Sequence, residues 1–236
     1  MKKELLYKGK VKSIWKTEDP GLYVAEYSDA ISAGDGAKRD VLAGKGELLN
    51  RISSILFTAL HEAGVDNHFV RKLDDRSQLV RAAELVALEV VVRNRAAGSI
   101  CRRLGLEQGL TLEKPLVEFF YKNDDLGDPL LTIDHVEMLD LATAKECQEL
   151  AEQALAVNKA LKPLFADIGL ELVDFKLEFG RDGEKLLLID EFSPDTCRLW
   201  QAGTMEGLDK DRFRNDSGDV LAGYREVLRR LEGGSF

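Results

Sequence analysis

The sequence has few residues of the kinds that cross-link a chain or bind transition metals. It contains 3 cysteines and 3 histidines among 236 residues. The cysteines lie far apart without a CxxC pair, so we expect reduced thiols and no zinc site. The histidines show no metal-ligand spacing, and we expect each to be an ordinary helix or loop residue and not a catalyst.

A long apolar run and an excess of positive charge are also lacking. No segment approaches the ~20 apolar residues of a membrane helix, and no apolar core of a signal peptide follows the charged start. These features predict a cytoplasmic protein. The formal net charge of -9 argues against a nucleic-acid partner. If the ligands are anions, the protein must gather positive charge locally.

The first ninety or so residues are predicted to form an antiparallel sheet with one helix. The helix is expected over residues 45–63, where apolar residues recur at helical spacing, and Gly64 follows as its C-cap. Residues 32–38, in which two glycines flank Asp35, are expected to form a loop. Strands are expected at residues 5–7, 11–15, 22–27, 69–73, 77–81 and 88–93.

The remainder is richer in helix. A capping box at residues 143–146 opens a predicted helix that runs to about Asp167, and a last amphipathic helix is expected over 219–231. Strands in runs followed by helices indicate an α+β fold. The chain is long enough for one large domain or two lobes around a cleft, and we expect a sheet-rich part over residues 1–85 and a mixed part over 86–236.

A predicted hairpin, strands 171–180 and 185–190, carries the strongest signal for metal chemistry. Side chains alternate across a strand, so Asp174, Lys176 and Glu178 share one face. Alone this pattern also fits a half-exposed edge strand. However, the return strand is apolar on both faces and ends in Asp190, and buried carboxylates are costly unless they are paired with a cation. Glu178 and Asp190 therefore predict a magnesium site.

Placing Asp190 on the face of Glu178 constrains the turn of this hairpin. A two-residue turn at 182–183 would point Asp190 to the opposite face. We therefore predict a three-residue bulged loop over 181–183, with Gly183 in the left-handed conformation.

Three further segments place cations where anions could bind. Lys8, Lys10 and Lys12 alternate around a glycine, as in turns that cover phosphates, although such hairpins are common. Arg93 ends an apolar strand and is followed by Ser99 at a predicted helix start, which suits a phosphate monoester better than a basic loop without a role. Cations interleaved with aspartate indicate a carboxylate site near the C-terminus, at Asp195, Arg198, Lys210, Arg212 and Arg214.

Several longer segments occur in a fixed order: YKGKVK, SAGDGAK, EVVVRNRAAGS, the lysine of KND, LVDFKLEFG, DEFSPD and DKDRFR. Through them the chain resembles the SAICAR synthetase (phosphoribosylaminoimidazole-succinocarboxamide synthase) family over essentially its full length. The resemblance implies a homodimer and an α+β, distantly kinase-like fold with a nucleotide cleft between an ATP-binding lobe, 1–85, and a lobe with metal and substrate sites, 86–236. It also implies a ligase of de novo purine biosynthesis that uses ATP and Mg²⁺ to join 5-amino-1-(5-phosphoribosyl)imidazole-4-carboxylate to L-aspartate.

The resemblance further implies a role for individual residues. ATP would be contacted by Lys10, Val11, Lys12, Leu85 in the adenine-side hinge, and Lys122, with Glu178 and Asp190 on Mg²⁺. The ribonucleotide is expected at Asp35, Arg93 and Ser99, and its reacting carboxylate at Lys176, Asp195 and Arg198. L-Aspartate is expected at Lys210 and Arg214. The residues leave open whether Asp195 or Asp174 accepts the proton of the aspartate amine.

Two positions depart from the family pattern, and two other functions compete with the ligase. Ala87 stands where the hinge usually has proline, and Cys197 follows the SPD segment, which predicts a thiol near the substrate that is sensitive to alkylation. A small-molecule kinase would not depend on aspartate. A nucleotide sensor would lack the set of Lys176, Glu178 and Asp190, all of which are present.

Overall fold

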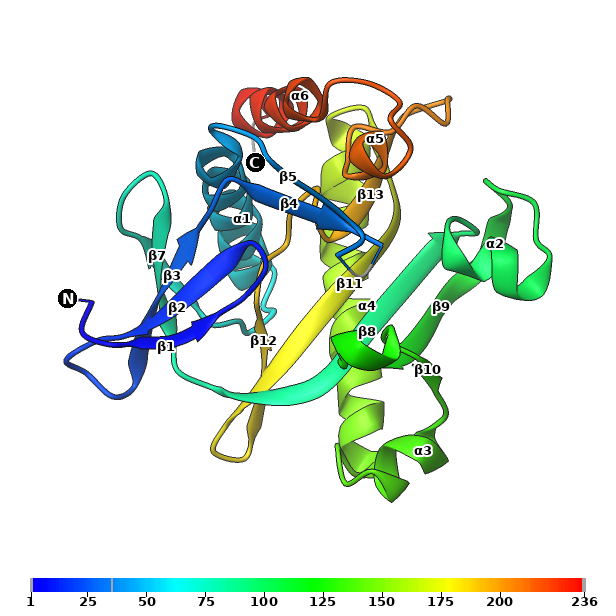
Figure 1. Ribbon diagram of the computed structural model, residues 1–236. Helices are drawn as coiled ribbons and strands as arrows, with labels where there is room; N and C mark the ends of the chain where they lie inside the picture. Colours follow the sequence, from blue (N-terminus) through cyan, green and yellow to red (C-terminus); the bar gives the residue numbers. More distant parts are fainter. Residues whose placement is uncertain (1, 35, 235–236) are drawn as a thin grey trace.

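The computed structural model describes residues 2–34 and 36–234 (Figure 1). An antiparallel five-stranded sheet fills the N-terminal part, in the strand order β1-β2-β3-β7-β6. The alternating short strands predicted from the sequence form it. Their bounds are β1 Leu5–Lys8, β2 Lys12–Lys16, β3 Leu22–Tyr27, β6 Phe69–Lys72 and β7 Ser77–Arg81.

A second antiparallel sheet is built around two long strands that lie side by side, β8 (Glu84–Arg95) and β11 (Leu170–Asp182) (Figure 1). The order is β10-β9-β8-β11-β12, and β13 also pairs with β11. The sequence analysis wrongly assigned residues 88–93 to the first sheet, because their partner on β11 lies about 80 residues further along the chain. The other strands are β9 Thr111–Tyr121, β10 Leu130–Leu131, β12 Lys185–Ile189 and β13 Cys197–Gln201.

Three long helices bury the apolar faces of the sheets. The helix α4 (Ala144–Asp167) contacts β8, β9 and β11, whereas α1 (Lys45–Glu62) contacts the first sheet and α6 (Val220–Gly233). One continuous core contains side chains from α1, α4, β8 and β11, so both sheets share it. No helix within the described ranges is long and apolar enough to cross a membrane. The short helices are α2 Ser99–Leu104, α3 Ile133–Met138, α5 Asp211–Arg214 and the 3₁₀ turn η1 Asp124–Leu126.

The predicted helices are confirmed, and the predicted loop is confirmed only in part. The capping box of Thr143 and Glu146 is formed at the start of α4. Within the segment expected to be a loop, β4 (Ala30–Ala33) and β5 (Lys38–Val41) pair as a small hairpin. The glycines mark only its turn. Asp35, a predicted site residue, lies outside the described residues.

The turn between β11 and β12 contradicts the predicted three-residue loop. Asp182 pairs with Lys185, so the turn has two residues, although Gly183 has the predicted left-handed conformation with φ 62°. The strand β12 ends at Ile189, and Asp190 itself adopts φ 67°. Aspartate rarely takes this conformation. The local reversal re-aims Asp190, which the register alone would have placed on the other face.

Candidate functional site

The polar face of the β8–β11 pair carries four predicted site residues, Arg93, Asp174, Lys176 and Glu178. Pairing of Asp174 with Arg93 and of Glu178 with Glu89 puts these side chains on one face. The opposite face is apolar and buried against α4, because valines and leucines alternate with the polar residues along β8. Alternation therefore separates a core face from a site face in the same two strands.

At one end of this face lies a group of three lysines and three carboxylates, which we call the lysine cluster: Lys12, Lys122, Lys176, Glu89, Glu178 and Asp190. Lys176 Nζ lies 2.7 Å from Glu89 Oε1 and 2.9 Å from Glu178 Oε1. Lys122 Nζ lies 2.7 Å from the same Glu178 oxygen, and Lys12 forms an ion pair with Asp190. Lysines from β2, β11 and the segment after β9 thus converge on carboxylates within β8 and β11 and on Asp190 just after β12.

Burial and mutual attraction oppose each other in the lysine cluster. Burial alone would lower the pKa of Lys176, but Glu178 and Glu89 hold this pKa well above its usual value. Burial likewise tends to raise the pKa of Asp190, and the charges of Lys12 and Lys176 bring it below the usual value. Both groups are therefore charged at neutral pH.

Glu178 and Asp190 fit a magnesium ion as two hard oxygen ligands. The described residues contain no group of three or more histidine, cysteine, aspartate or glutamate side chains placed to hold a metal. Mg²⁺ commonly takes only one or two protein carboxylates and completes its shell with water and substrate phosphates. The donor set therefore suits a metal that arrives with a nucleotide.

At the other end of the face, seven side chains of alternating charge form a continuous row of ion pairs, which we call the arginine chain: Arg103, Glu118, Arg93, Asp174, Arg198, Asp211 and Arg214. Glu118 accepts from Arg103 and from Arg93 Nε, each at 2.6 Å. Asp174 Oδ2 lies 2.8 Å from both Arg93 Nη1 and Arg198 Nη1. Asp211 completes the row, at 2.7 Å from Arg198 Nε and 2.6 Å from Arg214 Nη1.

Two arginines of the arginine chain, Arg93 and Arg198, lie beside the start of α2. Arg93 Nη2 donates to Ser99 Oγ at 3.1 Å, so the predicted pairing of these residues is present. Gly98, with φ 64°, packs against Arg198, and a Cβ there would lie 2.4 Å from Arg198 Nη2. Only glycine permits this approach. Arg198 therefore lies beside the same turn as Arg93.

Asp195 is the centre of a third, buried group. Its Oδ2 lies 2.7 Å from Lys45 Nζ and 3.6 Å from Lys210 Nζ, and its Oδ1 accepts from Tyr224 Oη at 2.5 Å. Burial would raise the pKa of Asp195, but Lys210 and Lys45 lower it to about 2. Asp195 is thus a fixed anion that joins α1, α6 and the segment before α5.

Some predicted residues lie apart from these groups. Arg212 donates to the carbonyl oxygens of Gly207 and Asp219 and to Glu206, so it holds a loop and does not join the predicted carboxylate site. Lys10 pairs with Asp124 at 2.7 Å, whereas Leu85 is exposed on β8. The carbonyl oxygen of Val11 accepts from Ser28.

Cys197 is not the reactive thiol expected from the sequence. Its side chain is buried, and burial together with nearby aspartates raises the pKa of the thiol well above its usual value. A thiol of this kind is inert toward alkylating agents.

Several residues of these groups were missed by the sequence analysis. Glu118 interrupts an otherwise apolar stretch of β9, and this charge in a strand was a usable signal. Lys45 and Tyr224 carry no local signal, because a lysine at a helix start and a tyrosine in an amphipathic helix are ordinary. Their partner Asp195 is 150 and 29 residues away, respectively.

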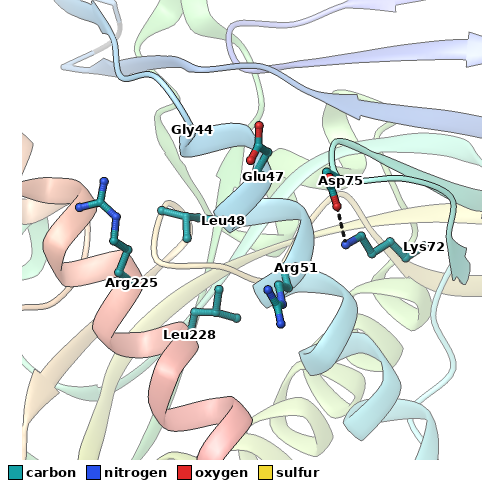
Figure 2. Close-up of a pocket in the computed structure, with 8 residues that line it drawn as sticks. All are labelled: Gly44, Glu47, Leu48, Arg51, Lys72, Asp75, Arg225 and Leu228. Carbon is teal, nitrogen blue, oxygen red and sulfur yellow. Dashed lines mark hydrogen bonds and ion pairs between the residues drawn. The ribbon is translucent and has the colours of Figure 1, made fainter.

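A separate surface hollow of about 360 Å³ lies between α1, α6 and the turn after β6 (Figure 2). Its lining mixes both charge signs, with Lys72 paired to Asp75 at 3.3 Å. None of the predicted site residues lines it. The concave surface of this hollow is therefore not the predicted site.

Comparisons with known proteins agree with the fold. The sequence profile described as SAICAR synthetase matches residues 5–231. A phosphoribosylaminoimidazole-succinocarboxamide synthase of Lysinibacillus sphaericus is 50% identical, over 98% of this chain and 99% of its own. The synthase structure from Ehrlichia chaffeensis superposes with a TM-score of 0.94 at 40% identity, covering 99% and 100% of the two chains. A SAICAR synthetase in complex with ADP gives 0.93 at 42% identity, covering 98% of each chain.

The fold and site define a nucleotide-dependent ligase with an α+β architecture. The chain belongs to the SAICAR synthetase family. The predicted fold class and the predicted ATP-dependent ligase of purine biosynthesis are confirmed, and the comparisons do not support the alternative of a small-molecule kinase.

Proposed function

We propose that this chain joins 5-amino-1-(5-phosphoribosyl)imidazole-4-carboxylate to L-aspartate through an amide bond while ATP becomes ADP and phosphate. The observation that carries this proposal is the presence of two different cation groups on one sheet face. The lysine cluster and the arginine chain both include side chains of β11, at Glu178 and Asp174. Residues four apart on a strand are about 13 Å apart, a spacing that suits one extended ternary complex.

The lysine cluster is proposed as the phosphate end of the ATP site. Lys10, Lys12 and Lys122 would contact the phosphates, with Val11 beside them and Leu85 in the hinge between the lobes 1–85 and 86–236. Glu178 and Asp190 would hold Mg²⁺, which when bound neutralises phosphate charge. A relative of similar fold was solved with ADP, which supports a nucleotide here.

The start of α2 is proposed as the site of the ribonucleotide phosphate. The unused N–H of Arg93 Nη2, the Nη2 group of Arg198 and the hydroxyl of Ser99 point to one turn. A planar guanidinium group can donate two parallel hydrogen bonds to the oxygens of a phosphate. Asp35 remains a proposed contact to the same substrate. Lys210 and Arg214 are proposed to bind L-aspartate.

Lys176 is proposed to act on the reacting carboxylate. A carboxylate is a poor electrophile, and transfer of the terminal phosphoryl group of ATP to it creates a good leaving group. The ammonium of Lys176, fixed between Glu89 and Glu178, would stabilise the charge that moves during this transfer. The amine of aspartate then attacks the activated carbonyl and displaces phosphate.

Asp174 and Asp195 are better suited to hold cations than to accept the amine proton, although the sequence suggested them as acceptors. Asp174 accepts from two arginines, and Asp195 accepts from Lys45 and Tyr224 and lies close to Lys210. Lys210 and Lys45 hold the pKa of Asp195 at about 2 against the effect of burial, which makes it a weak base, and Asp174 is already occupied by two guanidinium groups. We therefore propose that both orient neighbouring cations.

The proposal is tested by steady-state ADP release from purified protein with Mg²⁺, ATP and the ribonucleotide, with and without L-aspartate. Sustained turnover that needs both acceptor substrates is expected. Turnover with the ribonucleotide alone would instead indicate a kinase or an acyl phosphatase. Absence of turnover under both conditions would overturn the proposed reaction.

A homodimer in the cytoplasm is also proposed for this chain. Exposed apolar side chains gather on η1, β10 and α3, including Leu126, Leu130 and Ile133, and they offer a surface for self-association. Sedimentation at micromolar protein concentration would give the mass of one chain if this proposal is wrong.

A further inference from the structure

We infer that Glu118 and Asp211 are positioning residues for the phosphate-binding arginines: Glu118 fixes Arg93, and Asp211 fixes Arg198. This inference rests on the proposed function, because it takes the start of α2 as the phosphate site. Neither acid lies at that turn itself. Each acts through the arginine to which it is bound.

The arginine chain is most buried in its middle and more exposed at both ends. The side chains of Arg93 and Glu118 are 4% and 9% exposed, whereas those of the two terminal residues, Arg103 and Arg214, are 28% and 36% exposed. A buried guanidinium is costly without a partner carboxylate, and removing one partner leaves an uncompensated charge. The positions of the carboxylates therefore determine the positions of the arginine side chains.

Arg93 has almost no freedom to turn. Its Nε donates to Glu118 and its Nη1 donates to Asp174 and to the Ala97 carbonyl oxygen. One N–H of Nη2 reaches Ser99 Oγ. A guanidinium has five N–H groups in a plane, so one N–H on Nη2 remains. Glu118 binds Nε, whose N–H lies beside Nη2 in the guanidinium plane, so it fixes the tilt of that plane and the direction of the remaining N–H.

Arg198 is held in the same manner from the opposite side. Its Nε donates to Asp211 and its Nη1 to Asp174. Among residues 2–34 and 36–234, Nη2 has no hydrogen-bond acceptor, and it faces Gly98. The shared acceptor Asp174 fixes the separation of the two guanidiniums, while Glu118 and Asp211 fix their tilt. Two acids outside the turn thus aim two donor groups at one anion.

The test compares Glu118→Gln with Glu113→Gln, an exposed glutamate of the same strand. Glutamine keeps the shape and removes the charge that binds both Arg93 and Arg103. We expect the KM for the ribonucleotide to rise on the order of tenfold, since hydrogen bonds to charged groups carry energies of that size. The KM for ATP and the affinity for ADP should stay within twofold of wild type.

Direct binding separates this inference from the proposed reaction. Ribose 5-phosphate serves as a phosphate monoester probe in calorimetry, with ribose as the uncharged control. The probe should bind wild type and Glu113→Gln equally, and bind Glu118→Gln about tenfold more weakly. Absence of turnover by the wild-type protein would overturn the proposed reaction. If folded Glu118→Gln bound ribose 5-phosphate as tightly as wild type does, the positioning role of Glu118 would be overturned.

Two further variants guard against a general loss of folding. Glu118→Asp keeps the charge but is shorter by one methylene, so it cannot reach both arginines at hydrogen-bond distance. Asp211→Asn acts near the Arg214 end of the arginine chain. Both variants are expected to raise the KM for the ribonucleotide severalfold while the protein stays folded, as checked by urea unfolding. An equal rise in the KM for ATP would indicate a general structural effect and contradict the inference.

Discussion

The two ends of the site solve the same electrostatic problem with different cations. The proposed function requires both to bind anions in a chain of net charge -9, and in both the cations are paired with carboxylates. The lysine cluster uses compact ammonium groups, and Lys176 and Lys122 remain about 30% exposed. The arginine chain uses planar guanidiniums, and Arg93 is nearly inaccessible.

The difference follows the chemistry that we propose for each end. An ammonium group is a mobile point charge whose three N–H groups can follow a phosphoryl group in transfer. A guanidinium fixed by two or three acceptors presents one direction and suits a phosphate that only has to be held. Four experiments test this difference between the lysine cluster and the arginine chain.

The largest effect is expected from Asp190→Asn in the lysine cluster. The change removes a proposed magnesium ligand and the partner of Lys12, so magnesium-dependent turnover should fall at least ~100-fold, as for other preorganised charges. Turnover is measured across a magnesium titration, and thermal unfolding with and without Mg-ATP checks folding. Asp182→Asn, at the last residue of β11 in the same hairpin, is the control. Full activity of a folded Asp190→Asn protein would refute the metal assignment.

Arg93→Lys exchanges one kind of cation for the other. A lysine cannot contact Glu118, Asp174 and Ser99 together, so the KM for the ribonucleotide should rise by about 10- to 100-fold. The urea midpoint should also fall, because Glu118 loses a buried partner. Steady-state kinetics with each substrate varied measures the first effect, and Arg102→Lys on the exposed side of α2 is the control. Unchanged KM values would show that charge alone suffices and that the planar geometry is irrelevant.

A buried titrating group lies beside each end of the site, and the two have opposite pH effects. Burial and the charge of Lys12 lower the pKa of His68 to about 3, so its stabilising effect is present above pH 6.5 and is lost as pH falls toward 3. Burial and Asp211 raise the pKa of Asp209 to about 7, so its stabilising effect is present below about pH 4 and is lost as pH rises toward 7.

Without His68, the pH dependence of the free energy of unfolding should therefore be dominated by Asp209. In His68→Gln, the free energy of unfolding at pH 5 relative to pH 7 is expected to rise by about 2 kcal/mol compared with wild type, at about 1.4 kcal/mol per pH unit. Urea unfolding at both pH values measures it, with the exposed His61→Gln as control. Parallel pH dependences of variant and wild type would mean that His68 titrates normally in the folded protein.

The smallest effect concerns Cys197, which precedes Arg198 on β13. Iodoacetamide should modify the half-buried Cys101 first, and leave Cys197 and Cys147 unmodified until the protein unfolds. Peptide masses after timed alkylation measure the order. Rapid labelling of Cys197 in native protein would show that the structure around the arginine chain opens frequently. That result would contradict the rigid placement inferred for Arg198.

Much of the fold could be read from local patterns. The capping box at Thr143, the helical spacing from Lys45 and the alternating strands of the first sheet depend on contacts between near neighbours in the sequence. The assignment of β8 to the wrong sheet and the short strands β4 and β5 depend on partners that local pattern does not identify. The family resemblance supplied most of the residues of the proposed site, but it did not predict which of them form ion pairs with one another.

The sequence by itself determined which residues are charged, which face of each long strand is polar, and the family to which the chain belongs. Tertiary structure decided how those charges meet. The turn of the β11–β12 hairpin and the left-handed backbone of Asp190 depend on where the strand stops against its neighbours. Lys45 and Asp195 are joined across 150 residues. Such pairings form because a buried charge must find a partner in space, and the position of that partner along the chain is not fixed by any local pattern.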